Sequence, residues 1–205
     1  MNVKEKLHSF IENNEYELLL LDYFPNSEID PTTIKAIMIN EVVASIPEDD
    51  FYSSNLNSYY MSTVIPLFKN AGIEVETIQD ILEQGIYITS AIKMPKGNEL
   101  IKTDKIKKFL PILEKELDLF PNVKAIMLNG DIAKKAFNYI SKKKYGKNAV
   151  PAGSTYKLRK SDIFIGDIKI FPAYILTGKN VLIEKSKFDM NIEDLKRMIK
   201  RIEAK

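Results

Sequence analysis

Apolar residues are distributed along this chain in two alternating patterns. Short, nearly continuous apolar runs are typical of strands buried on both faces, and apolar residues spaced by three or four positions are typical of amphipathic helices. The predicted strands cover residues 34–39, 86–92, 123–128 and 167–172. The predicted helices cover residues 3–13, 58–71, 104–118 and 131–143, with a last helix that begins near Asn191. Because strands that alternate with helices pair in parallel through right-handed crossovers, the pattern predicts an α/β fold. We expect a three-layer α/β/α sandwich around a mainly parallel, four-stranded sheet.

Several shorter segments refine this outline. Thr77 is a suitable cap for a short helix that Gly85 ends. The apolar run at 16–24 fits a helix or a strand, and residues 155–159 carry a further short β signal. Neither a repeat nor a linker interrupts the chain, so we expect one domain over residues 1–205, with 1–33 as an N-terminal helical extension.

The composition excludes several kinds of chemistry. The 205 residues include no cysteine and one histidine, His8, so disulfides, zinc–thiolate sites, iron–sulfur clusters and Ser-His-Asp catalysis are not expected. We therefore predict no metal and no cofactor. The net charge of +2 neither demands nor excludes nucleic acid. The N-terminus lacks the features of a signal peptide, and the apolar run 18–21 is too short to span a bilayer, so we expect a cytoplasmic protein without a membrane partner.

Polar residues follow the predicted strands, and parallel pairing would bring them to one edge of the sheet. They are Asn40 and Glu41, the segment from Ser90 to Lys93, the segment 129–131, and the segment 172–179. Glu41 directly follows the first strand, where an ionised carboxylate would orient water or stabilise a cation. On its position alone, a capping or loop carboxylate is the simpler interpretation of Glu41.

Two further groups of residues have both a functional and a structural interpretation. Phe51 and Tyr52 lie in a polar loop, where they would stack on a planar ligand or fill the core. The densest basic region would contact phosphates or form a solvated face; it comprises Lys142, Lys143, Lys144, Lys147, Lys157, Arg159 and Lys160. The segment NGDIAKK at 129–135 has neither the dinucleotide-binding nor the P-loop pattern, so Asp131 is interpreted as a helix cap.

Five motifs in order resemble the uracil-DNA glycosylase superfamily, especially its family-four and family-five members. IMINEVVAS at 37–45 is similar to the strand that ends in a Gly-Glu-Ala-Pro-Gly-type loop, and YITSAIKMP at 87–95 to the Tyr-Ile-Thr-Asn-x-x-Lys-x-x-Pro strand. LNGDIA at 128–133 resembles the Leu-Gly-x-x-Ala turn, FPAYIL at 171–176 the His-Pro-Ser segment, and NIEDLKRMI at 191–199 the closing helix. The resemblance covers residues 34–203, most of the chain.

The resemblance implies roles for particular residues. Glu41, or Asn40 in the alternative register, would orient the attacking water. Phe51 would stack on the base, with Tyr52 as the second choice, and Ser90 would contact the base edge. Lys93 and the loop of Leu176, Thr177, Gly178, Lys179 and Asn180 would contact the phosphates and enter the duplex.

Two departures from the family pattern weaken the implied activity. Ser90 stands where the family has an asparagine that reads uracil, and Phe171 stands where it has a histidine that stabilises the developing charge on the base. Phenylalanine offers no hydrogen bond, and one lost oxyanion donor costs roughly 10²–10³ in rate in other enzymes. We therefore expect a divergent glycosylase-like protein that binds DNA, damaged or single-stranded, or a nucleobase, and that excises a damaged base. A non-catalytic binding module for nucleic acid, nucleotide or protein on the same fold is the alternative, and an unrelated α/β enzyme with a small anionic substrate is a third.

Overall fold

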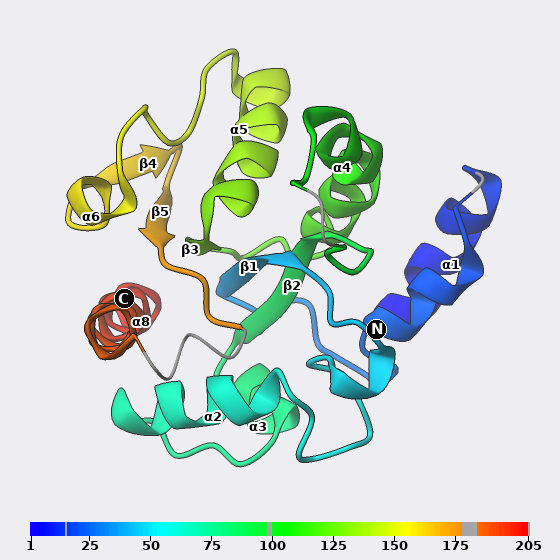
Figure 1. The fold of residues 1–205 in the computed structure, drawn as a ribbon, viewed down its shortest axis with the longest axis horizontal. Helices are drawn as coiled ribbons and strands as arrows, with labels where there is room; N and C mark the ends of the chain where they lie inside the picture. The colour runs from blue at the N-terminus through cyan, green and yellow to red at the C-terminus, as the bar shows by residue number, and fades with distance from the viewer. Residues whose placement is uncertain (15, 98–99, 178–183, 205) are drawn as a thin grey trace.

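A five-stranded, mostly parallel sheet forms the centre of the protein (Figure 1). The computed structural model describes residues 1–14, 16–97, 100–177 and 184–204. The strand order is β2-β1-β3-β5-β4, and the first four of these strands run parallel. The strands are β1 (Ala36–Val42), β2 (Ile86–Ile92), β3 (Ala125–Asn129), β4 (Ile163–Ile165) and β5 (Ile168–Ala173).

The prediction of four strands was wrong by one. Residues 163–165 form β4, which pairs antiparallel with β5 and ends the sheet on that side. The β signal at 155–159 was also wrong, because Thr155–Leu158 forms the short helix α6, whose first turn is capped by the Ser154 side chain. A single turn has too few residues to show a helical period, so its alternating residues were misleading.

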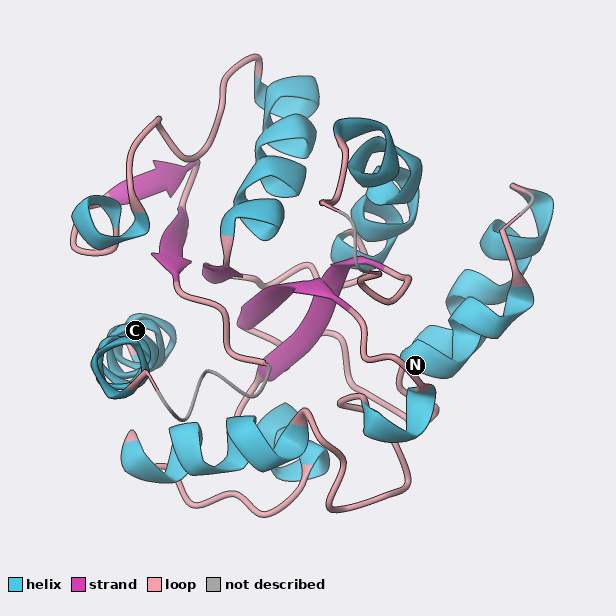
Figure 2. Cartoon of the chain, in the orientation of Figure 1, coloured by secondary structure: helices cyan, strands magenta, loops and turns pink. Residues whose placement is uncertain are grey.

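Helices cover both faces of the sheet (Figure 2). On one face lie α4 (Thr103–Leu117) and α5 (Asp131–Tyr145), and α1 (Val3–Asn13) packs beside α4. On the other face lie α2 (Met61–Asn70), α3 (Ile78–Glu83) and α8 (Lys185–Glu203). Because side chains alternate along a strand, Ile37 and Ile39 of β1 join the core under α4 and α5, and Met38 joins the core under α2 and α8. The short 3₁₀ helices are η1 (Leu18–Tyr23) and η2 (Pro47–Asp49).

Most helix ends follow their sequence signals. The predicted helix 3–13 is confirmed, with Asn2 as its cap, and Thr77 and Asp80 form a complete capping box at α3. The last helix begins at Lys185, six residues before the predicted cap Asn191. Asn191 is instead fully buried inside α8, where its side chain accepts from the Tyr174 backbone (3.1 Å) and donates to the Ile175 carbonyl (3.3 Å). No helix among the described residues combines the length and the apolar character needed to cross a bilayer.

Candidate functional site

The strand order defines where a ligand site is expected. The connection from β1 leads to β2 on one side, whereas the connection from β2 returns past β1 to β3 on the other side. In open parallel sheets, ligands bind at the carboxyl ends of strands where the connections diverge in this way. That point lies beyond the carboxyl ends of β1 and β3.

A cavity of about 260 Å³ lies at this edge, and we call it the β1 cavity. Its lining comes from the end of β1, the following loop, the start of α2, and the segments after β2 and β5. The lining residues are Glu41, Val42, Val43, Ala44, Ser45, Asp49, Tyr59, Tyr60, Lys96, Ile175 and Thr177. Of the residues predicted for the site, Glu41 and Thr177 therefore reach the cavity.

The Glu41 carboxylate is held by the first turn of α5. Its Oε1 accepts the backbone N–H of Ile132 at 3.1 Å. Gly130, with φ +101°, allows this approach, because a Cβ atom at that position would overlap the carboxylate. A carboxylate in this position lies at the N-terminal end of a helix, where the backbone N–H groups point toward it. The capping interpretation of Glu41 is thus confirmed, and the same carboxylate also faces the cavity.

Asn40 does not face the cavity. Its side chain is buried between strands, where it donates to the Thr89 carbonyl of β2 and accepts from the Asn129 side chain of β3, both at 3.3 Å. Asn40 therefore links three neighbouring strands, and Glu41 is the residue of this pair that is available to a ligand.

The predicted stacking residues are part of the core. Phe51 is 1% exposed, and its ring packs against Tyr60 at a centroid distance of 5.0 Å. Tyr52 stacks on Tyr87 at 5.9 Å, and its hydroxyl donates to the Ile88 carbonyl at 2.7 Å. The Phe51 ring is not available to a base in this structure, and the Tyr52 ring is half-buried against the core, which agrees with the core-filling interpretation. The aromatic residues of the cavity are Tyr59 and Tyr60 instead.

Lys93 does not reach the surface. It is 1% exposed, and its Nζ lies 2.9 Å from the carboxylate of the fully buried Glu116 on α4. The other oxygen of Glu116 accepts from the hydroxyls of Tyr87 and Thr89, both at 2.7 Å, and the Lys93 ammonium also contacts the Thr89 hydroxyl and the face of Phe24. The predicted phosphate contact is corrected: in this structure Lys93 completes a buried ion pair.

The remaining predicted residues are buried or lie outside the described residues. Ser90 donates to the Val42 carbonyl at 3.0 Å, and Phe171 is 2% exposed in the core under α8. Leu176 is 1% exposed, so it does not project as a wedge. Gly178, Lys179 and Asn180 lie outside the described residues, and their predicted roles stay predictions.

Nine lining residues were not predicted for the site, and they include Asp49, Tyr59, Tyr60 and Lys96. The loop after β1, which carries Asp49, is folded by the buried Asp50, whose carboxylate accepts the backbone N–H groups of Ala44 (2.6 Å) and Phe51 (2.8 Å). The Tyr60 N–H then bonds the Asp49 carbonyl at 3.0 Å. Burial and the neighbouring Asp49 raise the pKa of Tyr59. Burial and Asp50 do the same for Tyr60. Both phenols are therefore neutral at physiological pH. The pair of tyrosines in the first turn of the predicted helix 58–71 was the signal that could have found Tyr59 and Tyr60.

Three of the seven residues of the basic region, Lys143, Lys144 and Arg159, are engaged in ion pairs. Lys143 pairs with Glu114 at 2.7 Å and Lys144 with Asp118 at 2.6 Å. Arg159 is 3% exposed and bonds Asp194, so its charge is compensated inside the protein. These contacts favour the interpretation as a structural and solvated face.

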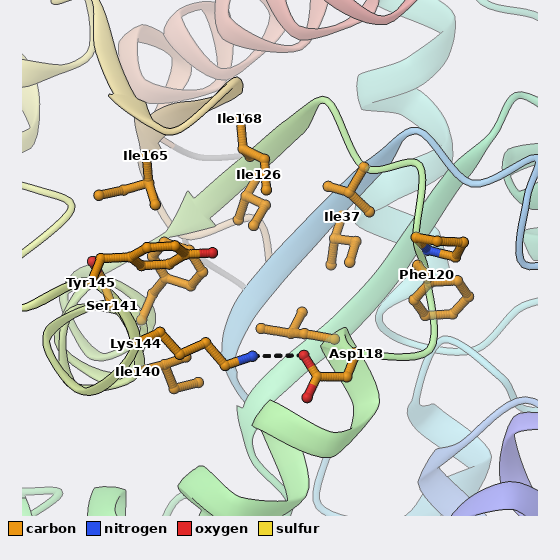
Figure 3. A pocket seen from close by; sticks show the side chains of 14 residues that line it. Ile37, Asp118, Phe120, Ile126, Ile140, Ser141, Lys144, Tyr145, Ile165 and Ile168 are labelled. Carbon is orange, nitrogen blue, oxygen red and sulfur yellow. Dashed lines mark hydrogen bonds and ion pairs between the residues drawn. The ribbon is translucent and has the colours of Figure 1, made fainter.

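A second cavity of about 240 Å³ lies between α4, α5 and the β4–β5 hairpin (Figure 3). Seven of its fourteen lining residues are isoleucine or phenylalanine, and the ion pair of Lys144 with Asp118 also belongs to its lining. Of the residues for which the sequence suggested a functional role, its described lining contains only Lys144, from the basic region. Among the described residues, no group of three histidine, aspartate or glutamate side chains could hold a metal ion.

Comparison with known proteins gives no family for this chain: no family model matches the sequence, and no significant match is found among curated proteins. The candidate site therefore rests on the geometry of the β1 cavity.

Proposed function

We propose that this chain is a divergent uracil-DNA-glycosylase-like protein that binds DNA or a nucleobase in the β1 cavity and excises a damaged base by hydrolysis of its N-glycosidic bond. The observation that carries the proposal is Glu41, a carboxylate fixed on the N-terminus of α5 that lines a cavity at the carboxyl edge of a parallel sheet. A helix-covered sheet of this kind is compatible with the three-layer α/β/α sandwich that the resemblance implies.

In the proposed reaction, the Glu41 carboxylate orients a water molecule toward the sugar carbon of the scissile bond. One carboxylate oxygen accepts the backbone N–H of Ile132 in α5, which fixes the orientation of the carboxylate. The second oxygen can then accept a proton from that water. Tyr59 and Tyr60 supply the aromatic surface for the base, in place of Phe51. Thr177 belongs to the segment that the resemblance places against the duplex.

The test is release of a base from duplex oligonucleotides that contain uracil or hypoxanthine, detected as strand cleavage at the resulting abasic site. We expect Glu41→Gln to lower the rate by a factor of about 10²–10⁴, the range of a general base. Glu48→Gln is the matched control, because Glu48 is exposed on η2 and does not line the cavity. Equal rates for the two variants would remove Glu41 from the mechanism, and no release from any substrate would reject excision.

A non-catalytic binding module is the second candidate function. It is favoured by the burial of Asn40, Phe51, Ser90 and Phe171, which leaves few polar groups directed at a base. This function predicts binding to duplex DNA that weakens steeply with salt and is not followed by cleavage. Binding measured by fluorescence anisotropy over a series of salt concentrations distinguishes it from the enzyme.

A further inference from the structure

The β1 cavity carries an excess of negative charge on its described lining. Glu41 and Asp49 contribute two carboxylates, and Lys96 contributes one ammonium. Lys96 is an exposed residue, so its charge is screened by solvent at the rim, whereas Glu41 and Asp49 are half-buried. The described lining is thus suited to a ligand with a positive charge on the part that enters the cavity.

The aromatic lining favours the same kind of ligand. Tyr59 and Tyr60 lie with ring centroids 6.3 Å apart, and Tyr60 is held by the bond from its N–H to the Asp49 carbonyl. Neutral phenol rings attract a cation through their faces, and a planar cation gains both this attraction and stacking. Carboxylate and aromatic groups that line one cavity suit the recognition of a cationic heterocycle.

The positions to which the resemblance assigns reading and charge stabilisation of the base supply no buried, fixed donor to this cavity, and its side-chain donors on Ser45, Tyr59, Lys96 and Thr177 are exposed or half-buried. The Ser90 hydroxyl is committed to the Val42 carbonyl, the Tyr60 hydroxyl donates to the same carbonyl at 3.2 Å, and Phe171 is packed in the core. A neutral base such as uracil leaves as an anion and needs such donors. A base that already carries a positive charge does not need them.

We infer that the preferred substrate is a nucleotide whose base is a cationic, N-alkylated heterocycle, recognised by Glu41, Asp49 and the two tyrosines. This inference rests on the proposed function. In the reaction, a water oxygen forms a bond to the C1′ carbon, and the pair of electrons of the C1′–N bond returns to the ring, which cancels its charge. The base leaves as a neutral molecule, and the proton of the water passes to Glu41. No co-reactant other than water is required.

The experiment compares base release from duplexes that contain 7-methylguanine, uracil or hypoxanthine at one position, each corrected for release without protein. A parallel arm measures binding of the free nucleosides 7-methylguanosine and 7-methyl-7-deazaguanosine by calorimetry, at a pH low enough to keep the first one cationic. These two nucleosides have nearly the same shape and differ in charge. We expect release of 7-methylguanine above background, and tighter binding of the cationic nucleoside by about tenfold or more.

Asp49→Asn separates charge recognition from a structural role. We expect this variant to lower release of 7-methylguanine by about tenfold relative to its effect on uracil, because only the cationic base loses an attraction. Glu48→Gln is again the control that leaves both rates unchanged. Equal losses on both substrates would assign Asp49 a structural role and overturn its part in recognition.

The outcomes distinguish this inference from the proposed function. Release of uracil or hypoxanthine without release of 7-methylguanine overturns the inference and leaves the glycosylase proposal intact. Equal binding of the two nucleosides also overturns it. Release of the base from free 7-methylguanosine but not from the duplex supports the recognition chemistry and rejects DNA as its source. No release and no binding to any duplex or nucleoside rejects both proposals.

Discussion

Replacement of Lys93 by methionine is the most informative test of the structure. Lys93 and Glu116 have side-chain exposures of 2% and 1%, and their charged atoms lie 2.9 Å apart. Lys93→Met keeps most of the apolar stem and removes the ammonium, so the variant leaves the Glu116 carboxylate buried without its counter-charge. Loss of one partner of a buried pair costs about 3–5 kcal/mol.

The expected result is a large fall in stability. For a domain of this length, each kcal/mol lowers the melting temperature by about 2–4 °C, so Lys93→Met should melt roughly 6–20 °C below the wild type. Thermal and urea unfolding followed by circular dichroism measure the loss. The double variant Lys93→Met/Glu116→Gln should recover much of it, because a glutamine oxygen still accepts from Tyr87 and Thr89 and no unpaired charge remains.

Lys96 provides the control, because it is an exposed lysine three residues further along the chain. Lys96→Met should change the free energy of unfolding by about 0.5 kcal/mol or less. A Lys93→Met variant that melts like the wild type but binds DNA more weakly would contradict the buried pair. It would restore the phosphate-binding role that the sequence predicted for Lys93.

Two further predictions concern the loop after β1 and the start of α5. Gly130→Ala should destabilise the protein by about 1–3 kcal/mol, because the backbone at Gly130 has φ +101°. It should also lower base release, because the new Cβ atom would displace the Glu41 carboxylate. Equal unfolding midpoints in urea for the variant and the wild type would refute this prediction. Burial raises the pKa of Asp50 to about 6, so the folded state holds this proton at a pH where the unfolded state has lost it. The Asp50 contribution to the free energy of unfolding therefore falls as pH rises from about 4 to about 6. The stability of Asp50→Asn should not show this decline with pH. At neutral pH the variant should also leave a backbone N–H of Ala44 or Phe51 without an acceptor. Parallel curves of stability against pH for the variant and the wild type would contradict the raised pKa of Asp50.

The fold was largely predictable because its strands are buried on both faces. A short, nearly continuous apolar run such as 123–128 predicts a central strand, and the structure places β3 at Ala125–Asn129. The start of α8 was not predictable in this way. Residues 185–190 are mostly exposed, and their apolar residues show no helical spacing. Asn191 is a residue type that is common at helix caps, but it is buried within the helix.

The site was less predictable than the fold, because neighbouring residues on a strand point to opposite sides. Asn40 and Glu41 are adjacent, yet one is sealed between strands and the other faces the cavity. The pattern of the sequence does not say which of two polar residues at a strand end turns outward. The loop between Phe51 and Tyr60 has no regular spacing of apolar residues, so the sequence does not predict their contact. That contact depends on how the Asp50 carboxylate folds the loop after β1 through its bonds to the backbone.

The position of Tyr52 also affects how this protein behaves at high concentration. In the part of the chain that the structure describes, β2 is an outer strand that pairs with β1 alone, so without cover its other side would present free backbone groups to a neighbouring molecule. The Tyr52 hydroxyl occupies both groups of Ile88, since it donates to the carbonyl at 2.7 Å and accepts the N–H at 3.3 Å. A strand from a second molecule cannot add at this point without displacing the phenol. Tyr52 thus contributes to the cover of β2, all of whose residues are buried, and a covered edge strand resists edge-to-edge aggregation.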